Sequence, residues 1–430
     1  MIFTTTISST FTSEFNELLQ RGKMDMDHVS SIVGNIINEI KSQKNVALKE
    51  HISKFDNWTP RSDEDLKIST DSMKKAYEEL NAELKSALHL AYDRIKTYHE
   101  KQKPKSWFDD EPNGTILGQR VTAVDSAGLY IPGGKAAYPS SLLMNVIPAQ
   151  VAGVEQIIVC TPTPDNEPNA LLLAACHLCG VSEVYKVGGA SAIAAMAYGT
   201  ENIPKVDVIT GPGNIFVATA KKMVFGDVNI DMIAGPSEIG ILADDSADAS
   251  HLAIDLLSQA EHDEMASSIL ITPSQKLADA VKVEIENWLV KLPRQEIARK
   301  SIEERGAIIV TQSMQEAIDL MNEIAPEHLE VATNSPFELL PLIKHAGAIF
   351  LGHNTPEAIG DYVAGPNHTL PTGGTAKFYS PLGVENFMKK TSIIAFSKNA
   401  IDEIGEACAL IANTEGLTAH EQSVRVRMSK

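Results

Sequence analysis

The sequence predicts an α/β protein that contains two parallel-sheet modules, with helical segments at its N-terminal and C-terminal ends. Three observations lead to this fold class. From about residue 130, short runs rich in β-branched residues alternate with Ala-rich stretches of helical length. Gly or Pro stands at the joints between them, as is typical of parallel strands joined by crossover helices. The runs also fall into two series, so we expect two modules of similar design.

Nine short runs are the expected strands, because each is apolar, β-branched and bounded by turn residues. The first series comprises EQIIVCTP (155–162), SEVYKVGG (182–189), VDVITGP (206–212), NIDMIAG (229–235) and EIGILADD (238–245). The second series comprises SSILITP (267–273), GAIIVTQ (306–312), HLEVATN (328–334) and GAIFLGH (347–353).

Helical segments are expected before and after these runs. Residues 1–125 are charged and helical in pattern, most clearly in the run 63–103, where leucines recur at helical intervals. The last fifty residues return to short helices. One of these should begin at Thr418, whose hydroxyl forms a capping box with Glu421 three residues on, and His420 would then lie in its first turn.

Composition excludes several classes of protein. A chain of 430 residues suggests two to four domains, and its 37 basic against 56 acidic residues give a net charge of −19. This charge argues against nucleic acid as a partner. The sequence has no apolar run of about 18 residues that could cross a membrane, and its first residues do not resemble a signal peptide. With only four cysteines, a disulfide framework is not expected. We therefore expect a cytoplasmic protein.

Two of the cysteines, Cys176 and Cys179, form a CxxC motif with His177 between them. A metal or redox site is one interpretation. The surrounding run LLLAACHLCGV reads as a buried helix, however, and no second CxxC completes a tetrahedral site. We predict core cysteines here.

Glycine-rich turns follow two of the expected strands. They are Gly188-Gly189 after VYKV and the turn Gly211–Asn214 after DVIT. Parallel sheets bind ligands at the carboxyl ends of their strands, where such turns bring backbone amides close to a phosphate. A phosphate-bearing cofactor is one interpretation, and simple turns without a ligand are the other. The dinucleotide fingerprint itself is absent, because Phe216 stands where its third glycine would be.

Two polar residues point to a metal. Gln259 and His262 stand three residues apart on an expected helix, so both side chains could reach one ion. Two ligands do not hold a metal, and the fold would have to supply others, such as Asp361 and His420. Solvated polar residues on a helix surface are the alternative interpretation.

An acid–base pair, Glu327 and His328, stands immediately before an expected strand. Histidine titrates near neutrality, and burial can raise the pKa of a glutamate, so the two suit general acid–base work. Ser237 lies on another glycine turn, in AGPSEIG, and Tyr130 opens the expected loop YIPGGKAAYPSS, but neither is informative alone.

Taken together, these segments resemble the histidinol dehydrogenase family. The resemblance runs from about residue 118 to the C-terminus in the order and spacing of the family, and the N-terminal helices are compatible with it. Eight ordered motifs do not recur by chance. They are IPGGKAAYPSSLLMNVIPAQVAGV, VGGASAIAAMAYGT, GPGN, AGPSE, SQAEHD, APEHLE, GDYVAGPNHTLPTGGTA and EGLTAH.

The resemblance implies a zinc- and NAD-dependent oxidation of L-histidinol to L-histidinal and then to L-histidine, the last two steps of histidine biosynthesis. It implies that Glu327 and His328 are the proton acceptors, and that one zinc ion per subunit orients the imidazole and amine of the substrate. The implied zinc ligands are Gln259, His262, Asp361 and His420. The implied substrate contacts are Ser237, Gln259, His262, His328, Asp361, Glu415 and His420.

The cofactor contacts implied by the resemblance are Tyr130, Ser191 and Asn214. At one of them this chain departs from the family, which commonly places Gln where Ser191 stands. A shorter side chain can still bond a hydroxyl group.

The resemblance also implies a domain-swapped homodimer, in which Glu415 and His420 serve the active site of the other subunit. The expected organisation is an N-terminal helical segment, two Rossmann-like domains and a C-terminal helical dimerisation segment. The expected boundaries are 1–25 for the first segment, 26–129 with 238–380 for the first Rossmann-like domain, 130–237 for the second, which carries the NAD contacts, and 381–430 for the last segment.

Two other functions remain open from the sequence. A paralogous zinc- and NAD-dependent dehydrogenase of another polar alcohol, such as a sulfonated diol, would keep the zinc ligands and the Glu-His pair. Glu415 and Ser237, in the positions that meet histidinol, favour the biosynthetic enzyme. A zinc-stabilised binding protein without turnover is disfavoured, because it has no need for both Glu327 and His328.

Overall fold

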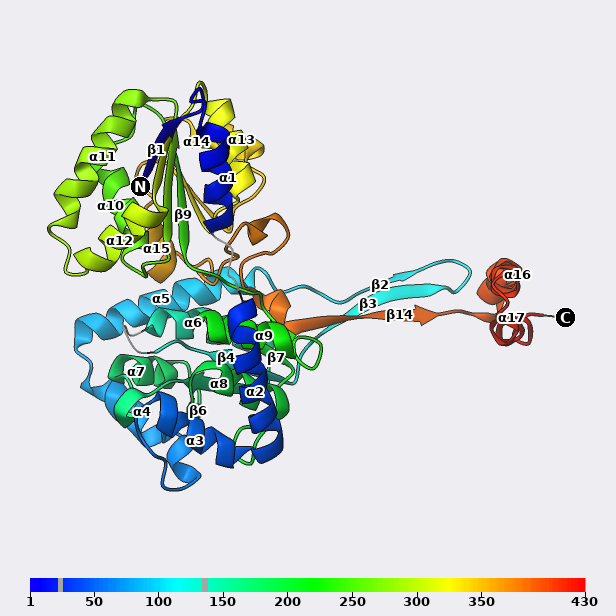
Figure 1. The fold of residues 1–430 in the computed structure, drawn as a ribbon. Coiled ribbons are helices and arrows are strands. Elements are labelled where there is room, and N and C mark those ends of the chain that lie inside the picture. Colours follow the sequence, from blue (N-terminus) through cyan, green and yellow to red (C-terminus); the bar gives the residue numbers. More distant parts are fainter. Residues whose placement is uncertain (22–25, 134–137, 430) are drawn as a thin grey trace.

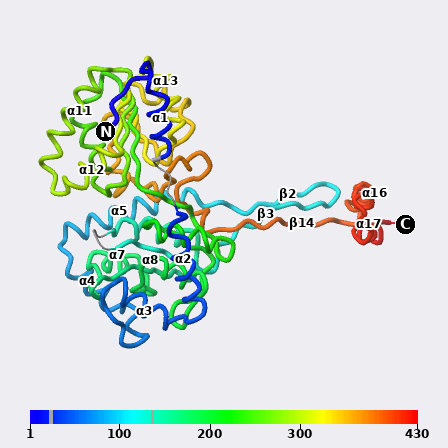
Figure 2. Tube along the Cα trace, in the orientation of Figure 1, coloured from blue at the N-terminus to red at the C-terminus, as the bar shows by residue number. Residues whose placement is uncertain are grey.

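Two α/β modules lie one against the other, and a long arm projects from their junction and carries the C-terminus (Figures 1 and 2). The structure is a computed structural model that describes residues 1–21, 26–133 and 138–429. Part of the expected loop between residues 131 and 141 therefore lies outside the described residues, as do the last residues of the expected segment 1–25.

The first module is built on a six-stranded sheet in which every neighbouring pair of strands is parallel. The strand order is β1–β11–β10–β9–β12–β13, so the order reverses between β9 and β12. Two apolar clusters, one on each face, form its core. The strands are β1 (Ile2–Thr5), β9 (Glu238–Ala243), β10 (Ser267–Thr272), β11 (Ala307–Val310), β12 (His328–Ala332) and β13 (Ala348–Leu351). The helices are α1 (Phe11–Arg21), α10 (Ala249–Ala260), α11 (Gln275–Leu289), α12 (Gln295–Arg305), α13 (Met314–Ile324), α14 (Pro336–Leu339) and α15 (Glu357–Tyr362).

The second module repeats this arrangement on a five-stranded parallel sheet in the order β6–β5–β4–β7–β8. Here the order reverses between β4 and β7, and two more apolar clusters bury the sheet. The strands are β4 (Ser126–Tyr130), β5 (Gln156–Thr161), β6 (Glu183–Lys186), β7 (Val208–Thr210) and β8 (Asn229–Ile230). The helices are α2 (Asp27–Gln43), α3 (Asn45–Phe55), α4 (Thr70–Glu79), α5 (Ala82–Glu100), α6 (Pro139–Ala152), α7 (Ala170–Leu178), α8 (Gly189–Tyr198) and α9 (Ile215–Val224).

Polar residues fix where many of these helices begin. A Ser, Asn or Asp at the N-cap accepts a hydrogen bond from a backbone N–H of the first turn, which satisfies a donor that has no partner within the helix. These caps are Ser69, Asn81, Asn169, Asn214, Asp248, Ser274 and Ser313. Single turns of 3₁₀ helix occur at Glu64–Leu66, Pro164–Asn166, Leu340–Leu342, Thr375–Lys377 and Val384–Phe387.

The arm is a three-stranded antiparallel sheet that ends in two helices (Figure 1). Strand β14 pairs with β3 along its whole length, from Met388 opposite Ala123 to Ala395 opposite Ile116, and β2 pairs with the other edge of β3. Large apolar side chains on the arm are exposed, among them Phe108 at 65% and Val426 at 74%. The elements are β2 (Trp107–Asp110), β3 (Ile116–Ala123), β14 (Met388–Ala395), α16 (Lys398–Thr414) and α17 (Thr418–Arg425).

The predicted α/β class and both parallel sheets are confirmed, and each of the nine predicted runs contains one strand, from β5 to β13. Cys176 and Cys179 are free and buried, as predicted for core cysteines. Within the described residues, no helix is both long enough and apolar enough to cross a membrane.

The predicted boundaries differ from the observed packing. Helices α2–α5, in the range 26–129, pack against the second module and not with 238–380, because their apolar faces join the clusters around β4 to β7. The segment 1–25 contributes an edge strand, β1, as well as a helix, and 381–430 contains β14 in addition to helices. The predicted capping box is wrong, since the N-cap of α17 is Leu417 and no side chain caps it.

Candidate active site

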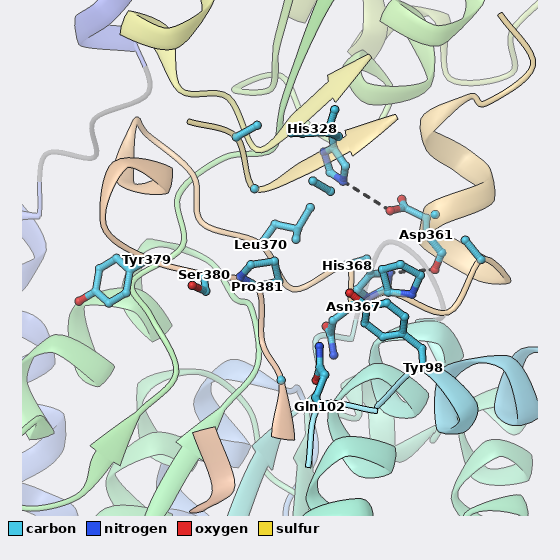
Figure 3. Close-up of a pocket in the computed structure, with 18 of the residues that line it drawn as sticks. Tyr98, Gln102, His328, Asp361, Asn367, His368, Leu370, Tyr379, Ser380 and Pro381 are labelled. Carbon is cyan, nitrogen blue, oxygen red and sulfur yellow. Dashed lines mark hydrogen bonds and ion pairs between the residues drawn. The ribbon is translucent and has the colours of Figure 1, made fainter. Parts of the chain in front are cut away.

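A cavity of about 1080 Å³ lies between the two modules, and residues of both modules line it (Figure 3). From the first module come His328, at the start of β12, and Asp361 of α15. From the second come Tyr98 of α5 and the nearby Gln102. His328 of the predicted acid–base pair and Asp361, a predicted metal ligand, therefore meet at the junction of the modules, and His328 stands at the amino end of its strand.

The backbone fixes the orientation of the His328 imidazole. Its Nδ1 donates a hydrogen bond to the carbonyl oxygen of Glu238 at 3.1 Å, because a carbonyl can only accept. Its Nε2 is buried and has no hydrogen-bond partner among the described residues, with Asp361 Oδ1 3.6 Å away. Figure 3 shows the ring pointing toward Asp361. Since Nδ1 carries the proton in a neutral ring, Nε2 is the nitrogen that can accept one.

Glu327 lies beside this ring and is held by the neighbouring strand. Its Oε2 accepts a hydrogen bond from the backbone N–H of Glu238 at 2.9 Å and lies 3.7 Å from His328 Nδ1. Burial raises the pKa of Glu327 to about 8 and that of the Glu238 carboxyl to about 7. A carboxyl group whose pKa lies near neutrality can give and take protons at physiological pH.

The charges around His328 act on it in opposite directions. Burial alone would lower the pKa of the imidazole, but the carboxylates of Glu357, Glu327 and Asp361 outweigh burial and raise that pKa well above its ordinary value. For Asp361, burial would raise the pKa, yet the imidazoles around it lower it instead, so this group stays ionised. An ionised carboxylate, that of Asp361, therefore lies beside His328.

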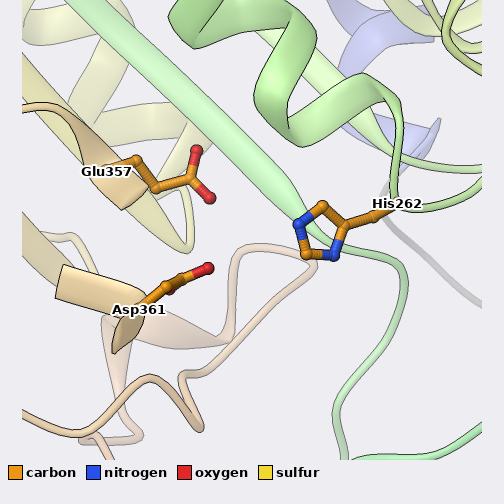
Figure 4. A group of neighbouring side chains, drawn as sticks. All are labelled: His262, Glu357 and Asp361. Atoms are coloured by element: carbon orange, nitrogen blue, oxygen red, sulfur yellow. The ribbon is translucent and has the colours of Figure 1, made fainter. Parts of the chain in front are cut away.

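Three side chains at this point face one another with the spacing of metal ligands (Figure 4). One ligand atom each from His262, Glu357 and Asp361 lies within 4.8 Å of the others. An imidazole nitrogen and carboxylate oxygens are donors that suit zinc and other divalent cations. Burial lowers the pKa of His262 and so favours the neutral ring that binds metals.

Gln259 lies against the same group. In the amide orientation that satisfies its neighbours, its NH₂ donates to Glu357 Oε2 at 3.1 Å and its oxygen accepts from the N–H of Glu238 at 3.0 Å. It is the next-to-last residue of α10, and His262 follows in the turn after the helix. Gln259, His262 and Asp361 are therefore close together, as the prediction required. Ser237, half-buried, immediately precedes Glu238 at the start of β9.

Two predicted site residues lie far from the cavity and from the candidate metal ligands. Glu415, in the turn between α16 and α17, and His420 of α17 are exposed and lie at the far end of the arm, well away from the body of the chain (Figure 1). Within one chain, the fold brings together three of the four predicted ligands, Gln259, His262 and Asp361, and leaves His420 far from them.

Two residues at the site were missed by the sequence analysis. Glu357 stands four residues before Asp361 on α15, and this i,i+4 spacing was a signal that could have revealed it. His368 lines the cavity, where its Nδ1 donates to the Asp361 carbonyl at 3.0 Å and its Nε2 lies 3.3 Å from the hydroxyl of Ser141 in α6. His368 thus joins the two modules beside the candidate metal ligands (Figure 3).

The predicted cofactor residues gather at the carboxyl edge of the second sheet. Tyr130 is the last residue of β4, and its hydroxyl accepts a hydrogen bond from the N–H of Gly189 at the start of α8, at 3.2 Å. Burial raises the pKa of Tyr130 to about 12, so the phenol stays protonated. Asn214 follows β7 and caps α9 through bonds from Phe216 N and Val217 N. Because β4 and β7 flank the point where the strand order reverses, this is the edge at which such sheets bind ligands.

Ser191 lies in the first turn of α8 and is buried. Its hydroxyl is 2.9 Å from Nδ1 of His51, whose Nε2 is in turn 2.7 Å from a carboxylate oxygen of Glu39. The hydroxyl that was expected to meet the cofactor is therefore engaged within the protein, by a helix that packs on α8.

Comparison with known proteins places the whole chain in one group of relatives. The family model described as histidinol dehydrogenase matches residues 19–428. A histidinol dehydrogenase of Sulfurimonas denitrificans is 85% identical over 430 residues, which cover 100% of each chain. One from Wolinella succinogenes is 68% identical over 418 residues and 97% of each chain. The crystal structure of histidinol dehydrogenase from Elizabethkingia anophelis superposes with a TM-score of 0.93 at 36% identity, and the match covers 99% of this chain and 98% of that one.

Proposed function

The chain belongs to the histidinol dehydrogenase family and is an oxidoreductase of histidine biosynthesis, and from this premise we propose that it oxidises L-histidinol to L-histidine through bound L-histidinal, with NAD and zinc. The observation that carries the proposal is the geometry of His328. Its Nδ1 is tied to a backbone carbonyl, and its buried Nε2 faces the cavity without a hydrogen-bond partner among the described residues. Glu327 lies beside it with a pKa of about 8. A fixed, desolvated base with a titratable carboxyl as neighbour suits two successive proton abstractions.

We propose that Gln259, His262 and Asp361 hold the zinc ion, with His420 from a second copy of the chain as the fourth ligand. Support comes from the spacing of His262 and Asp361, which together with Glu357 place donor atoms within 4.8 Å of one another. When bound, zinc would act as a Lewis acid that holds the imidazole and amine of the substrate, and two NAD molecules in succession would each accept one hydride. Glu357, which bonds Gln259, would orient that ligand and add negative charge near the ion.

His328 is the proposed base of the first oxidation. Its Nε2 accepts the proton of the substrate hydroxyl as the alcohol carbon loses a hydride, which leaves the aldehyde. A base must be unprotonated, and positive charge beside Glu357 and Asp361 would oppose the carboxylates that raise the pKa of His328. Asp361, 3.6 Å from Nε2, would stabilise the imidazolium that forms.

Glu327 is the proposed base of the second stage. Its carboxylate takes a proton from water as the water oxygen adds to the aldehyde carbon, and the His328 imidazolium returns its proton to the aldehyde oxygen, which gives the hydrate and a neutral His328. His328 then accepts a proton from one hydroxyl of the hydrate as the second hydride leaves, and the carboxylic acid forms. The bond from Glu238 N to Glu327 Oε2 holds the carboxylate in place throughout. A site between two modules also shields the aldehyde from bulk water.

The substrate contacts proposed from the family are Ser237, Gln259, His262, His328, Asp361, Glu415 and His420. We propose that NAD lies at the carboxyl edge of the second sheet, against Tyr130 and Asn214. The reversal of strand order between β4 and β7 supports this position. Ser191 would contribute through the backbone of its helix turn, because its hydroxyl is already bonded to His51.

We propose a homodimer in which the arm of each chain completes the site of the other. The support is that Glu415 and His420 lie at the exposed end of an arm on which large apolar side chains are left uncovered by the residues that the structure describes. A second copy is the partner that would supply both the missing ligand and the cover. We also propose that the enzyme acts in the cytoplasm, where amino-acid biosynthesis takes place.

The rival function is the oxidation of another polar alcohol, such as a sulfonated diol, on the same scaffold. The test is the yield of NADH from a limiting, known amount of histidinol, with a sulfonated diol in a parallel cuvette and the zinc content measured beside it. We expect two NADH per histidinol and none from the diol. One NADH per histidinol would contradict the second oxidation, and turnover of the diol alone would establish the rival.

A further inference from the structure

A buried ion pair that the proposed reaction does not use lies behind the candidate cofactor edge. Lys221 of α9 forms an ion pair with Asp231, which follows β8, and their side chains are 2% and 0% exposed. Lysine is almost never fully buried unless it is paired. Taking two such charges out of water costs several kcal/mol per ion in general. A contribution to stability therefore does not by itself explain why this ion pair is buried here.

Both members of the Lys221–Asp231 ion pair bind the same residue, Gly211. The Lys221 ammonium donates to the Gly211 carbonyl oxygen at 2.9 Å, and Asp231 Oδ2 accepts from the Gly211 N–H at 2.8 Å. The other oxygen of Asp231 accepts from the N–H of Met232 at 2.6 Å. One ion pair thus fixes the peptide groups on both sides of Gly211, and charge-assisted bonds of this kind are about twice as strong as neutral ones.

Gly211 is a position where the backbone itself needs to be held. Its φ is +116°, and a Cβ added there would lie 2.0 Å from the carbonyl oxygen of Tyr130, so only glycine fits. The turn that starts here leads to Asn214 at the N-cap of α9. Gly211 has no side chain to anchor it, and the ion pair supplies that anchor. It holds the end of β7 against the end of β4, at the point of strand-order reversal.

We propose that Lys221 and Asp231 are positioning residues for the cofactor, which fix the turn Gly211–Asn214 against Tyr130 and thereby set the affinity for a dinucleotide. The proposal rests on the proposed position of NAD at this edge. It explains why a costly buried charge pair stands here, since a turn that must meet a pyrophosphate loses affinity when it is displaced even slightly. Asp231 also lines the large cavity, which brings the anchored turn to the reaction site.

The test separates positioning from stability. Lys221→Met alone leaves a buried carboxylate without its cation and should lower Tm, whereas Lys221→Met with Asp231→Asn removes both charges and should recover most of the loss. In the double variant the Gly211 carbonyl still lacks its donor. We expect Kd and KM for NAD to rise about tenfold and KM for histidinol to change less than about twofold. Lys221→Arg, which keeps the charge but cannot place one nitrogen in the same way, should raise Kd for NAD at nearly unchanged Tm.

The matched control is the ion pair of Lys67 and Glu183 in the same module. Glu183 stands at the amino end of β6, at the edge of the sheet opposite to the candidate cofactor edge. Lys67→Met with Glu183→Gln should leave Kd for NAD as in the wild type. The proposal is overturned if the double variant and Lys221→Arg both fold and bind NAD as the wild type does. If the wild-type protein itself does not bind NAD, the proposed function fails instead, which is a separate outcome. The readouts are direct NAD titration, the two KM values and thermal unfolding.

Discussion

Replacement of Glu327 by Gln should abolish the pH dependence of the second oxidation. With a pKa of about 8, the wild-type carboxyl is ionised in about one molecule in ten at pH 7, half at pH 8 and about nine in ten at pH 9. If this carboxylate activates the water, histidinal oxidation should rise about fivefold from pH 7 to pH 8 and less than twofold from pH 8 to pH 9. Glu327→Gln should lower the rate on histidinal by on the order of 10²–10⁴-fold, more than on histidinol, and remove this rise.

The assay is NADH formation in stopped flow, with histidinal and histidinol as separate substrates across pH 6–9.5. Glu330→Gln is the matched control, because Glu330 is a buried carboxyl on β12, the strand that follows Glu327, and a Gln there still accepts the bond from the N–H of Glu357. Its pH profile should keep the rise. Equal losses of Glu327→Gln on the two substrates, or an unchanged rise near pH 8, would refute the assignment of Glu327.

Stability gives a second check on the same pKa. The folded pKa of Glu327 lies above its unfolded value, so the stability that this group contributes is present below about pH 4.5 and is lost as pH rises through about 8. Gln cannot ionise. The Tm of Glu327→Gln should therefore fall less than that of the wild type between pH 7 and pH 9, in protein stripped of metal.

Three further outcomes are expected. Asp361→Ala should bind less than one-tenth of the zinc of the wild type by metal analysis and should lose histidinol oxidation, because its carboxylate is one of few donors at the point where the ligands meet. Its circular dichroism should stay native. Full activity in a metal-free variant would contradict this expectation. His328→Asn protein and His420→Ala protein should each be inactive, and their mixture should regain up to about a quarter of wild-type activity after subunit exchange. The reason is that half the molecules become heterodimers, each with one intact site of two. Failure to complement despite proven exchange would mean that His420 serves its own chain. Ser191→Ala should change KM for NAD by less than about threefold, because the lost hydroxyl bonds His51, and a tenfold loss would show a direct contact.

Much of the sheet structure could be predicted because its signals are local. The runs that became β5 to β13 are continuous apolar stretches, as strands covered on both faces require. The same alternation placed Glu327 and His328 at the start of a strand. The edge strand β1 gave no such signal, since Ile2–Thr5 is short and pairs with residues about three hundred positions away.

The parts that failed depend on contacts distant in sequence. Helices α2–α5 carry apolar faces that fit either sheet, and their pattern does not say which, so the domain boundary was misplaced. Glu357 was overlooked because a carboxylate on a short helix looks like a surface residue, and only the fold brings it to Gln259. The position of His420 far from its own cavity agrees with the expectation drawn from the family resemblance, but no local pattern in the sequence predicted the arm that carries it.

The strands of the arm are far apart in the sequence, and this determines when the arm can form during synthesis of the chain. Its central strand, β3, leaves the ribosome early, while its partner β14 is synthesised only after both modules. Until then the hairpin of β2 and β3 offers an open edge beside exposed Trp107 and Phe108, which favours unwanted pairing with other chains. Contacts that must wait for the end of the chain also slow folding. Truncation or stalled translation before Met388 would therefore yield two folded modules with an unpaired edge on β3. Other chains could pair with this edge, so loss of the residues from Met388 onward would lower solubility as well as activity.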